Sequence, residues 1–293
     1  MNIGLCIPLI APYASPEYIR VLGQSAEELG FSTLWIGEHV VLFDEYDSRY
    51  PLAEDGKMPG NAEDNVEMET FTSLAFLAAH TRTIRLGTGV CVLPQRNPVY
   101  TAKEVSNVDW LSNGRLTLGL GVGWLAEEYA AVGASFEKRG ARCDSYLEVM
   151  KRLWCDKVSS YEDEFYHLPE CRFYPKPVQQ PYPPIVFGGN NNATFRRVAS
   201  EGGGWYALGL NPQQLSVQLG KLDDKLKEHG RSRQDISIYA CPYPHEHDQE
   251  MIRQYHELGV DEVILLDFAA STEELETLLK NLTATYIDFV KSL

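Results

Sequence analysis

The chain has 293 residues and a formal net charge of −15, from 26 basic and 41 acidic residues. A surface this acidic repels phosphate backbones and anionic lipids, which argues against a nucleic-acid-binding or membrane-surface protein. The proportions of 44% hydrophobic and 23% charged residues exclude disorder as the main state of the chain.

Short apolar runs alternate with amphipathic stretches along the whole chain. The first pair is a strand at 2–7 and a helix at 16–29, which has Ser15 as its N-cap, Pro16 at its first position and Gly30 as its C-cap. The other predicted strands are 33–36, 84–87, 116–120, 184–187, 205–208, 236–241 and 262–266. The other predicted helices are 69–80, 99–111, 126–131, 141–153, 193–200, 212–229, 248–258 and 272–290.

Eight strands that are each followed by helix predict a parallel sheet, and this count in 293 residues is typical of a (β/α)₈ TIM barrel. We therefore expect a single domain over residues 1–293. A doubly wound open sheet is the alternative fold, but it usually has fewer strands, and the first βα turn lacks the GxGxxG fingerprint of that fold.

Two long segments interrupt the barrel pattern. Residues 40–66 follow the second strand, so we expect them at the carboxyl ends of the strands, where barrel active sites are built. Residues 155–183 precede the fifth strand and contain a candidate hairpin near 162–164. Long loops on a compact domain are often lids or binding loops, so we expect both insertions to frame a site.

The stretch LWIGEH ends the second strand and places Glu38 and His39 at the predicted barrel mouth. Histidine titrates near neutral pH and can transfer protons, although a histidine at a strand end can also be purely structural. Glu127 and Glu128 are expected on a solvated helix face. No set of His, Cys, Asp and Glu residues has a convincing metal-ligand spacing, so no metal site is predicted.

Glycines gather at the ends of two more strands, in RLGTGV (Arg85 to Val90) and GLGVGW (Gly119 to Trp124). Glycines there allow close backbone approach by a ligand, allow a bulge, or form a plain turn, and the second set predicts a surface on which a flat ring could lie. After the fifth strand, GGNNNAT begins at Gly188 and leads directly into a helix. Free amides and the helix dipole favour an anion there, and the alternative is an asparagine-rich N-cap.

The six cysteines lie in no disulfide framework and include no CxxC pair, which predicts reduced thiols. No apolar run approaches the roughly 18 residues of a membrane span, and the N-terminus lacks the basic start of a signal peptide. We therefore expect a cytoplasmic protein.

Taken together with RNP (Arg96 to Pro98), FEKRGAR (Phe136 to Arg142), YPKPVQQPYPPIVFGGN and EGGGWYALG, these motifs resemble the luciferase-like monooxygenase superfamily. The resemblance extends in order from about residue 2 to 210 and is strongest to the branch of oxidoreductases that depend on deazaflavin (coenzyme F420). It implies a (β/α)₈ barrel that holds a reduced flavin or deazaflavin at its mouth, and a homodimer.

The resemblance also implies roles for single residues. Glu38 and His39 are the expected catalytic pair, for cofactor contact and proton transfer. In the deazaflavin branch a non-prolyl cis peptide backs the ring, and it corresponds to Gly89–Val90 here. The expected cofactor-binding residues are Glu38, Thr88, Gly89, Val90, Gly121, Gly123, Trp124, Gly188, Gly189 and Asn190.

One position departs from the family pattern. Sugar-phosphate dehydrogenases of this family carry a catalytic glutamate just after the fourth-strand glycines, where this chain has Trp124. We therefore expect a bulkier or more apolar small-molecule substrate.

Three functional hypotheses follow. The first is an F420-dependent oxidoreductase that transfers hydride to or from a small organic substrate. The second is a two-component monooxygenase that uses reduced FMN from a separate flavin reductase. The third, a non-catalytic flavin-binding barrel, is disfavoured because Glu38 and His39 are both present. The first two cofactors share a ring and a ribityl phosphate, but the deazaflavin carries an anionic lactyl-oligoglutamate tail. Binding that tail requires a basic rim, for which the chain offers Arg96, Lys138, Arg139, Arg196 and Arg197.

Overall fold

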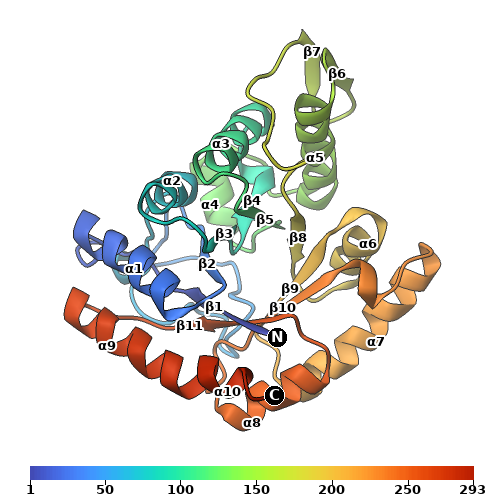
Figure 1. The fold of residues 1–293 in the computed structure, drawn as a ribbon. Coiled ribbons are helices and arrows are strands. Elements are labelled where there is room, and N and C mark those ends of the chain that lie inside the picture. Colours follow the sequence, from blue (N-terminus) through green and yellow to red (C-terminus); the bar gives the residue numbers. More distant parts are fainter.

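A computed structural model describes the backbone of residues 1–293 and every side chain except that of Asp64. Eight parallel strands form a barrel in the order β3-β2-β1-β11-β10-β9-β8-β5, and β3 pairs with β5 to close it (Figure 1). They are β1 (Asn2–Cys6), β2 (Thr33–Ile36), β3 (Arg85–Thr88), β5 (Leu116–Gly121), β8 (Ile185–Gly188), β9 (Gly204–Leu208), β10 (Ser237–Cys241) and β11 (Glu262–Leu266). The predicted (β/α)₈ barrel is confirmed.

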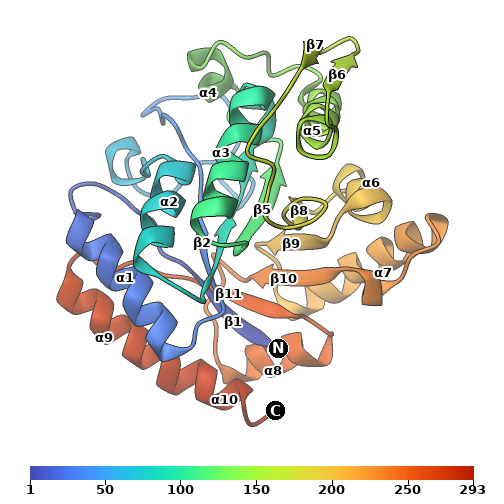
Figure 2. The same ribbon diagram turned by 45° about the horizontal axis from the view of Figure 1, so that its top comes forward.

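Helices surround the barrel, and Figure 2 shows them arranged around the strands. They are α1 (Pro16–Leu29), α2 (Thr70–His80), α3 (Pro98–Leu111), α5 (Arg139–Cys155), α6 (Asn192–Glu201), α7 (Pro212–Glu228), α8 (Gln249–Glu257) and α9 (Thr272–Leu282). The helix signals in the sequence act as expected at α1. The Ser15 side chain accepts a hydrogen bond from the Tyr18 amide, and Gly30 ends the helix with a φ of 88°.

The sequence predicted one continuous helix over 272–290, but the last helix of the structure is interrupted. The α-helix α9 gives way to a π-helical segment at Thr283–Ile287 and then to the short α10 (Asp288–Val290). At this change the Thr283 hydroxyl donates to the Leu279 carbonyl at 2.8 Å. Such back-bonding competes with the regular helical ladder and bends helices.

The barrel interior is filled by its own small cluster of buried side chains, separate from the core beneath the outer helices. Trp35 is its centre: its ring packs edge-on against Tyr206 and Tyr239, and its Nε1 donates to Glu262 at 2.7 Å. A Cβ at Gly87 would lie 2.4 Å from the Trp35 ring, so this strand glycine makes room for the tryptophan. The cluster forms a packed floor below the carboxyl ends of the strands.

Both predicted insertions are present. Residues 40–66 follow β2 and include a short 3₁₀ helix at Ala62–Asp64. The second insertion holds the antiparallel hairpin of β6 (Ser159–Glu162) and β7 (His167–Cys171). It contacts α5, where Asp163 accepts a hydrogen bond from the Ser145 hydroxyl at 3.0 Å. The remaining short elements are β4 (Cys91–Val92), α4 (Ala126–Ala131) and two 3₁₀ helices at Leu93–Gln95 and Arg233–Asp235.

The state of the cysteines agrees with the prediction of reduced thiols. All six cysteines are free thiols, and four of them are buried. Among the described residues, no helix combines the length and the apolar character needed to cross a membrane.

Candidate active site

The carboxyl ends of the barrel strands surround a cavity of about 250 Å³, which we call the mouth cavity. Six predicted site residues line it: Glu38, His39, Gly89, Val90, Gly123 and Trp124. They come from the ends of three strands that lie side by side in the closed sheet, β2, β3 and β5. Parallel strands of a barrel end at one face, which explains how residues far apart in sequence meet here.

The loop of residues 40–66 covers this cavity. Tyr50, Leu52 and Met58 from the loop are among its lining residues. Trp124 stacks edge-on against Tyr46 and Tyr50, with ring centroids 5.6 and 5.2 Å apart. This loop therefore frames the site as predicted. The second insertion does not: no residue of 155–183 lines the mouth cavity, because that segment follows a helix and lies along α5 on the outside of the barrel.

Two glutamates of α4 hold the covering loop, and the expectation of a solvated face for both was wrong. The Glu127 carboxylate accepts hydrogen bonds from the amides of Asp47 and Ser48, at 2.7 and 3.2 Å. Glu128 is only 2% exposed, and its carboxylate accepts from the Val40 amide at 2.7 Å. Both carboxylates thus satisfy backbone amides of the loop, which tethers the loop to α4.

Glu128 also pairs with His39. The His39 Nδ1 lies 3.4 Å from a Glu128 carboxylate oxygen, and the ring packs edge-on to Trp124 at 6.0 Å. Burial raises the pKa of the Glu128 carboxyl, but hydrogen bonds from His39, Gln95 and Val40 outweigh burial and lower it. Glu128 is therefore a fixed anion beside His39 and orients its ring.

Glu38 lies on the same cavity wall but is already held by protein groups. Its carboxylate accepts from the Val92 amide at 2.5 Å and from Arg96 Nε at 2.8 Å. Arg96 also pairs with Glu69 at 2.6 Å and Glu104 at 2.8 Å. This network fixes the β2 end against α2 and α3, so Glu38 presents a charge of fixed position to the cavity.

Glu67 is a third glutamate of this cavity, and sequence reasoning did not single it out. Its Oε2 atom is buried and has no hydrogen-bond partner among the described side chains and backbone groups. Burial raises the pKa of this carboxyl to about 7, although His39 and a hydrogen bond from the Gly37 backbone act in the opposite direction. A perturbed carboxyl in a cleft is a candidate acid or base.

The glycines at the strand ends make room for the end of β3. A Cβ at Gly121 would lie 2.6 Å from the Val90 side chain, and one at Gly119 would lie 2.0 Å from the Thr88 carbonyl oxygen. A Cβ at Gly188 would also meet Val90, at 3.0 Å. These glycines make room for the β3 end, which bulges into the barrel, so Val90 rather than a bare glycine surface faces the cavity.

The peptide bond between Gly89 and Val90 is cis, as the family resemblance implied. Thr88, beside it, is fully buried, and its hydroxyl donates to the Gly119 carbonyl at 2.6 Å. Thr88 therefore does not line the mouth cavity.

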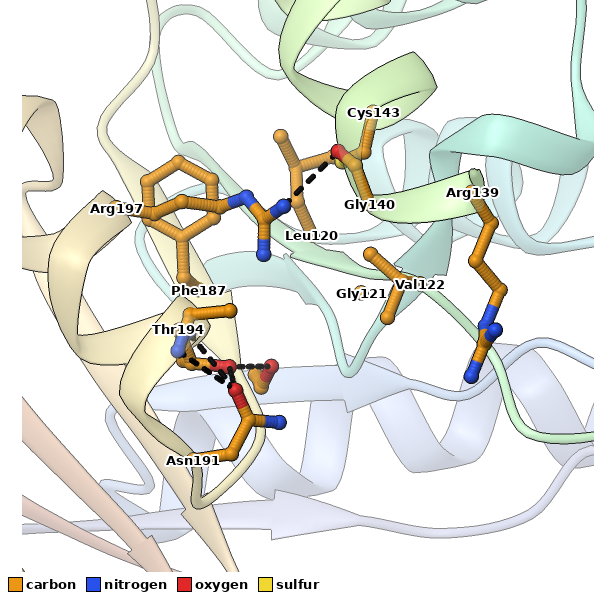
Figure 3. A pocket seen from close by; sticks show the side chains of 12 residues that line it. Leu120, Gly121, Val122, Arg139, Gly140, Cys143, Phe187, Asn191, Thr194 and Arg197 are labelled. Carbon is orange, nitrogen blue, oxygen red and sulfur yellow. Dashed lines mark hydrogen bonds between the residues drawn. The ribbon is translucent and has the colours of Figure 1, made fainter. Parts of the chain in front are cut away.

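A second cavity, of about 230 Å³, lies between β5, α5 and α6, and we call it the α6 cavity (Figure 3). The predicted residues Gly121 and Gly188 line it, together with Thr194, Arg139 and Arg197 among others. Val90 packs on both glycines from the side of the mouth cavity. The two cavities are therefore neighbours across one residue.

The amides at the start of α6 are partly used by the protein itself. The Asn191 side chain accepts from the amides of Ala193 and Thr194, at 3.0 and 3.1 Å, as an ordinary N-cap does. Gly189, with a φ of 117°, turns the chain into the helix, and its carbonyl accepts from Trp205 Nε1 at 2.8 Å. An anion in the α6 cavity thus relies on the Thr194 hydroxyl and nearby cations as much as on free amides.

Most of the expected basic rim is neutralised. Arg96 pairs with Glu38, Lys138 with Glu164, and both Arg196 and Arg197 pair with Asp144. Arg139 is the exception: among the described residues no carboxylate lies within ion-pair distance of it. Its guanidinium lies 3.8 Å from the centre of the Phe136 ring and donates to the Gly123 carbonyl at 3.3 Å.

Asn190 completes the list of predicted residues. Its Nδ2 donates to the Leu208 carbonyl at 2.7 Å, and Leu208 lines the mouth cavity. Its Oδ1 is buried without a partner. Buried polar atoms are nearly always paired, so this oxygen is a free acceptor at the edge of the site.

Known proteins are similar to this chain in sequence and in fold. Residues 3–286 match the family of luciferase-like monooxygenases. An uncharacterised protein of Mycobacterium tuberculosis is 29% identical over 269 residues, which are 89% of this chain and 90% of that protein. The FMNH2-dependent dimethylsulfone monooxygenase of Pseudomonas putida is 27% identical over 221 residues, 74% of this chain and 55% of that enzyme.

Among solved structures, the coenzyme F420-dependent tetrahydromethanopterin reductase of Methanopyrus kandleri has the same fold. It matches with a TM-score of 0.74 over 98% of this chain and 99% of that one, at 17% identity. Matched along nearly its whole length in sequence, the chain belongs to the luciferase-like monooxygenase family of oxidoreductases.

Proposed function

We propose that the chain binds reduced coenzyme F420 across its two cavities and transfers hydride between that deazaflavin and a small organic substrate. The observation that carries this proposal is the placement of the α6 cavity and the mouth cavity on either side of Val90. One cavity offers a site for an anion and the other offers proton-transferring side chains. A cofactor with a phosphate at one end and a reactive ring at the other requires this arrangement.

The residues present fit such a group. Two buried polar atoms that have no hydrogen-bond partner among the described residues lie at this site: Glu67 Oε2 and Asn190 Oδ1. A flavin-type ring carries N–H donors and carbonyl acceptors along its edge, so it can satisfy such groups. In the α6 cavity, Arg139 and the Thr194 hydroxyl would hold the phosphate.

When bound, the reduced deazaflavin supplies a hydride to an acceptor carbon. The chain's own residues supply the rest of the chemistry. His39, held by Glu128, moves a proton at the cavity wall. Val90 and Gly89 form an apolar wall for the ring, and the loop over Trp124 restricts the access of water. Glu38 stays fixed by Arg96 and adds a negative charge beside the reacting groups.

Hydride transfer to or from an oxygen-bearing carbon needs a proton donor or acceptor at the same place. The mouth cavity holds two such groups, His39 and Glu67, which supports the hydride-transfer proposal. Binding of each reduced cofactor to the purified protein without oxygen tests it. We expect reduced F420 to bind; binding of reduced FMN together with failure to bind F420 would refute the F420 proposal.

The second candidate function is a monooxygenase that takes reduced FMN from a separate reductase and uses molecular oxygen. The observation that favours it is the neutralised rim. Of the five basic residues considered, Arg139 alone lacks a carboxylate partner, and one cation suits a terminal phosphate better than an oligoglutamate tail. The relative from Pseudomonas putida uses FMNH2 by its name. The same binding experiment separates the two candidates.

A further inference from the structure

Glu67 occupies a position that its backbone fixes. The chain returns here from the covering loop, and Glu67 forms an antiparallel bridge with Ile10 just beyond β1. The next residue, Met68, donates its amide to the Leu9 carbonyl at 2.9 Å. Thr70, three residues after Glu67, donates its hydroxyl to the Gly37 carbonyl at 2.6 Å. The segment is thus attached to the ends of both β1 and β2, and the Glu67 side chain lines the mouth cavity.

Gly37 allows the carboxyl to approach the end of β2. A Cβ at this position would lie 2.8 Å from Glu67 Oε1, closer than real side chains pack. The glycine of LWIGEH therefore makes room for Glu67, and the Gly37 backbone donates a hydrogen bond to its carboxyl. The other oxygen, Oε2, is buried and unpaired.

The three glutamates of the mouth cavity differ in their partners. Glu38 is held by Arg96 and the Val92 amide, and Glu128 by Val40, Gln95 and His39. Hydrogen-bond donors of the protein thus occupy both carboxylates. Glu67 has no cationic partner of this kind, and its unpaired oxygen leaves one hydrogen-bonding position for another molecule.

The cavity also has a clear charge character. None of the described residues that line it is lysine or arginine, and its only side chain able to become cationic is His39, which already faces Glu128. Aromatic and aliphatic side chains, among them Tyr50, Trp124 and Leu266, make up much of the remaining wall. A carboxylate or phosphate on the substrate would face three glutamates with no free cation, which disfavours it electrostatically.

We propose that Glu67 exchanges a proton with the substrate oxygen, and that the mouth cavity takes uncharged substrates that carry a carbonyl or an alcohol group. This inference rests on the proposed function for the source of the hydride, but the protonation of Glu67 does not. It gives the mouth cavity a catalytic glutamate at Glu67, in a chain that has Trp124 where the sugar-phosphate dehydrogenases carry theirs.

The chemistry balances in both directions. In reduction, the substrate carbon receives a hydride and its electron pair from the reduced deazaflavin, which becomes oxidised. The carbonyl π bond breaks, and the oxygen takes the proton from Glu67 Oε2, so the product is an alcohol and Glu67 becomes a carboxylate. Water then returns a proton to Glu67. In oxidation, the Glu67 carboxylate accepts the hydroxyl proton as the hydride leaves the carbon.

The groups that face Glu67 explain why it holds a proton near neutral pH. Burial is the main cause of its raised pKa, and the neighbouring charge of Glu38 adds to it. His39 opposes both effects when it is protonated. Cys6, at the end of β1, is a buried thiol whose own pKa is raised by burial and by Glu67, so it stays neutral beside it.

Infrared difference spectroscopy over a pH titration tests the protonation directly, without turnover. We expect the carbonyl stretch of a protonated carboxyl to disappear with a midpoint near pH 7, and this signal to be lost in Glu67→Gln. The matched control is Glu63→Gln, an exposed glutamate of the covering loop four residues before Glu67, which should leave the signal unchanged. Absence of the signal in the wild-type protein, or its persistence in Glu67→Gln, would overturn the proposal.

A second measurement uses the unmodified chain, so it does not depend on folding of a variant. Dicyclohexylcarbodiimide is apolar and reacts with protonated carboxyls, and mass spectrometry identifies the labelled peptide. We expect labelling of Glu67 at pH 6 to fall at least tenfold by pH 8.5. Labelling of Glu38 or Glu128 in preference to Glu67 would refute the assignment. If neither reduced cofactor binds, the proposed function fails, whereas these two experiments still decide the state of Glu67.

Discussion

Replacing Glu67 by glutamine should stabilise the protein at alkaline pH. The folded protein raises the pKa of this carboxyl from 4.5 to about 7, so the folded state binds its proton more tightly than the unfolded state does. The stability contributed by the protonated group is fully present below pH 4.5 and is lost as the pH rises through 7. Glutamine stays neutral, so Glu67→Gln avoids this loss.

The size of the effect follows from the two pKa values. At about 1.4 kcal/mol per pKa unit, ionised Glu67 costs roughly 3 kcal/mol well above pH 7. The free energy of unfolding of Glu67→Gln minus that of the wild type should therefore grow by roughly 2 kcal/mol between pH 5.5 and 8.5.

Urea unfolding at several pH values measures this difference, and all other titrating groups cancel in it. Glu63→Gln, at an exposed position of the covering loop, should change the free energy of unfolding little and by the same amount at every pH. A difference for Glu67→Gln that stays constant with pH, or that falls as the pH rises, would refute the claim that Glu67 is a neutral acid in the folded protein.

Five further variants test other parts of the site and the proposed homodimer. His39→Ala should lower turnover by about 10²- to 10⁴-fold with little change in cofactor affinity, and an unchanged rate would reject its role in proton transfer. Glu128→Gln should destabilise the protein by about 1–3 kcal/mol at pH 7, measured by urea unfolding. Because the pKa of Glu128 is lowered in the folded state, this loss should shrink as the pH falls through that pKa, and a loss independent of pH would contradict the pairing with His39. Arg139→Ala should weaken binding of the reduced cofactor by about 10- to 100-fold, whereas Arg196→Ala, exposed and already paired with Asp144, should change it little; equal effects would place the phosphate elsewhere. We propose that the chain forms a homodimer through α3, where Tyr100, Trp110 and Leu111 are all more than half exposed, so Leu111→Lys should halve the mass measured by light scattering, and an unchanged mass would exclude this face.

The fold and part of the site could be predicted because they depend on local signals. Each strand is a short apolar run, each helix has its caps, and the count of eight implies a barrel. Once the barrel is assumed, strand-end residues must meet at its mouth, which is why Glu38, His39, Val90 and Trp124 lie together in the structure.

Glu67 and Glu128 could not be found this way because their places depend on how distant segments return to the barrel. Glu67 reaches the cavity through its bridge with Ile10, and Glu128 through the loop amides that it binds. The sequence resembled an ordinary solvated helix at Glu128, and Glu67 lies just after the polar stretch of 40–66, where no site residue was predicted. A signal was present at Gly37, since a glycine at a strand end indicates close approach of another group, which is Glu67 here.

The packing of the strand-end glycines was also beyond what the sequence could predict. Their spacing suggested a bare surface for a flat ring, but Gly119, Gly121 and Gly188 accommodate the inward bulge of Thr88 and Val90. The packing partner of a glycine is a tertiary property that the spacing does not reveal. The asparagine-rich turn before α6 likewise showed both of its predicted alternatives, because Asn191 caps the helix while the α6 cavity remains beside it.

The central claim is that one cofactor spans the two cavities across Val90. A crystal structure of the protein grown without oxygen in the presence of reduced F420 tests it most directly. We predict the deazaflavin ring against Val90 in the mouth cavity, near His39 and Glu67, and the phosphate beside Arg139 and Thr194 in the α6 cavity. A ring bound outside the mouth cavity, or a phosphate bound away from the α6 cavity, would contradict the account.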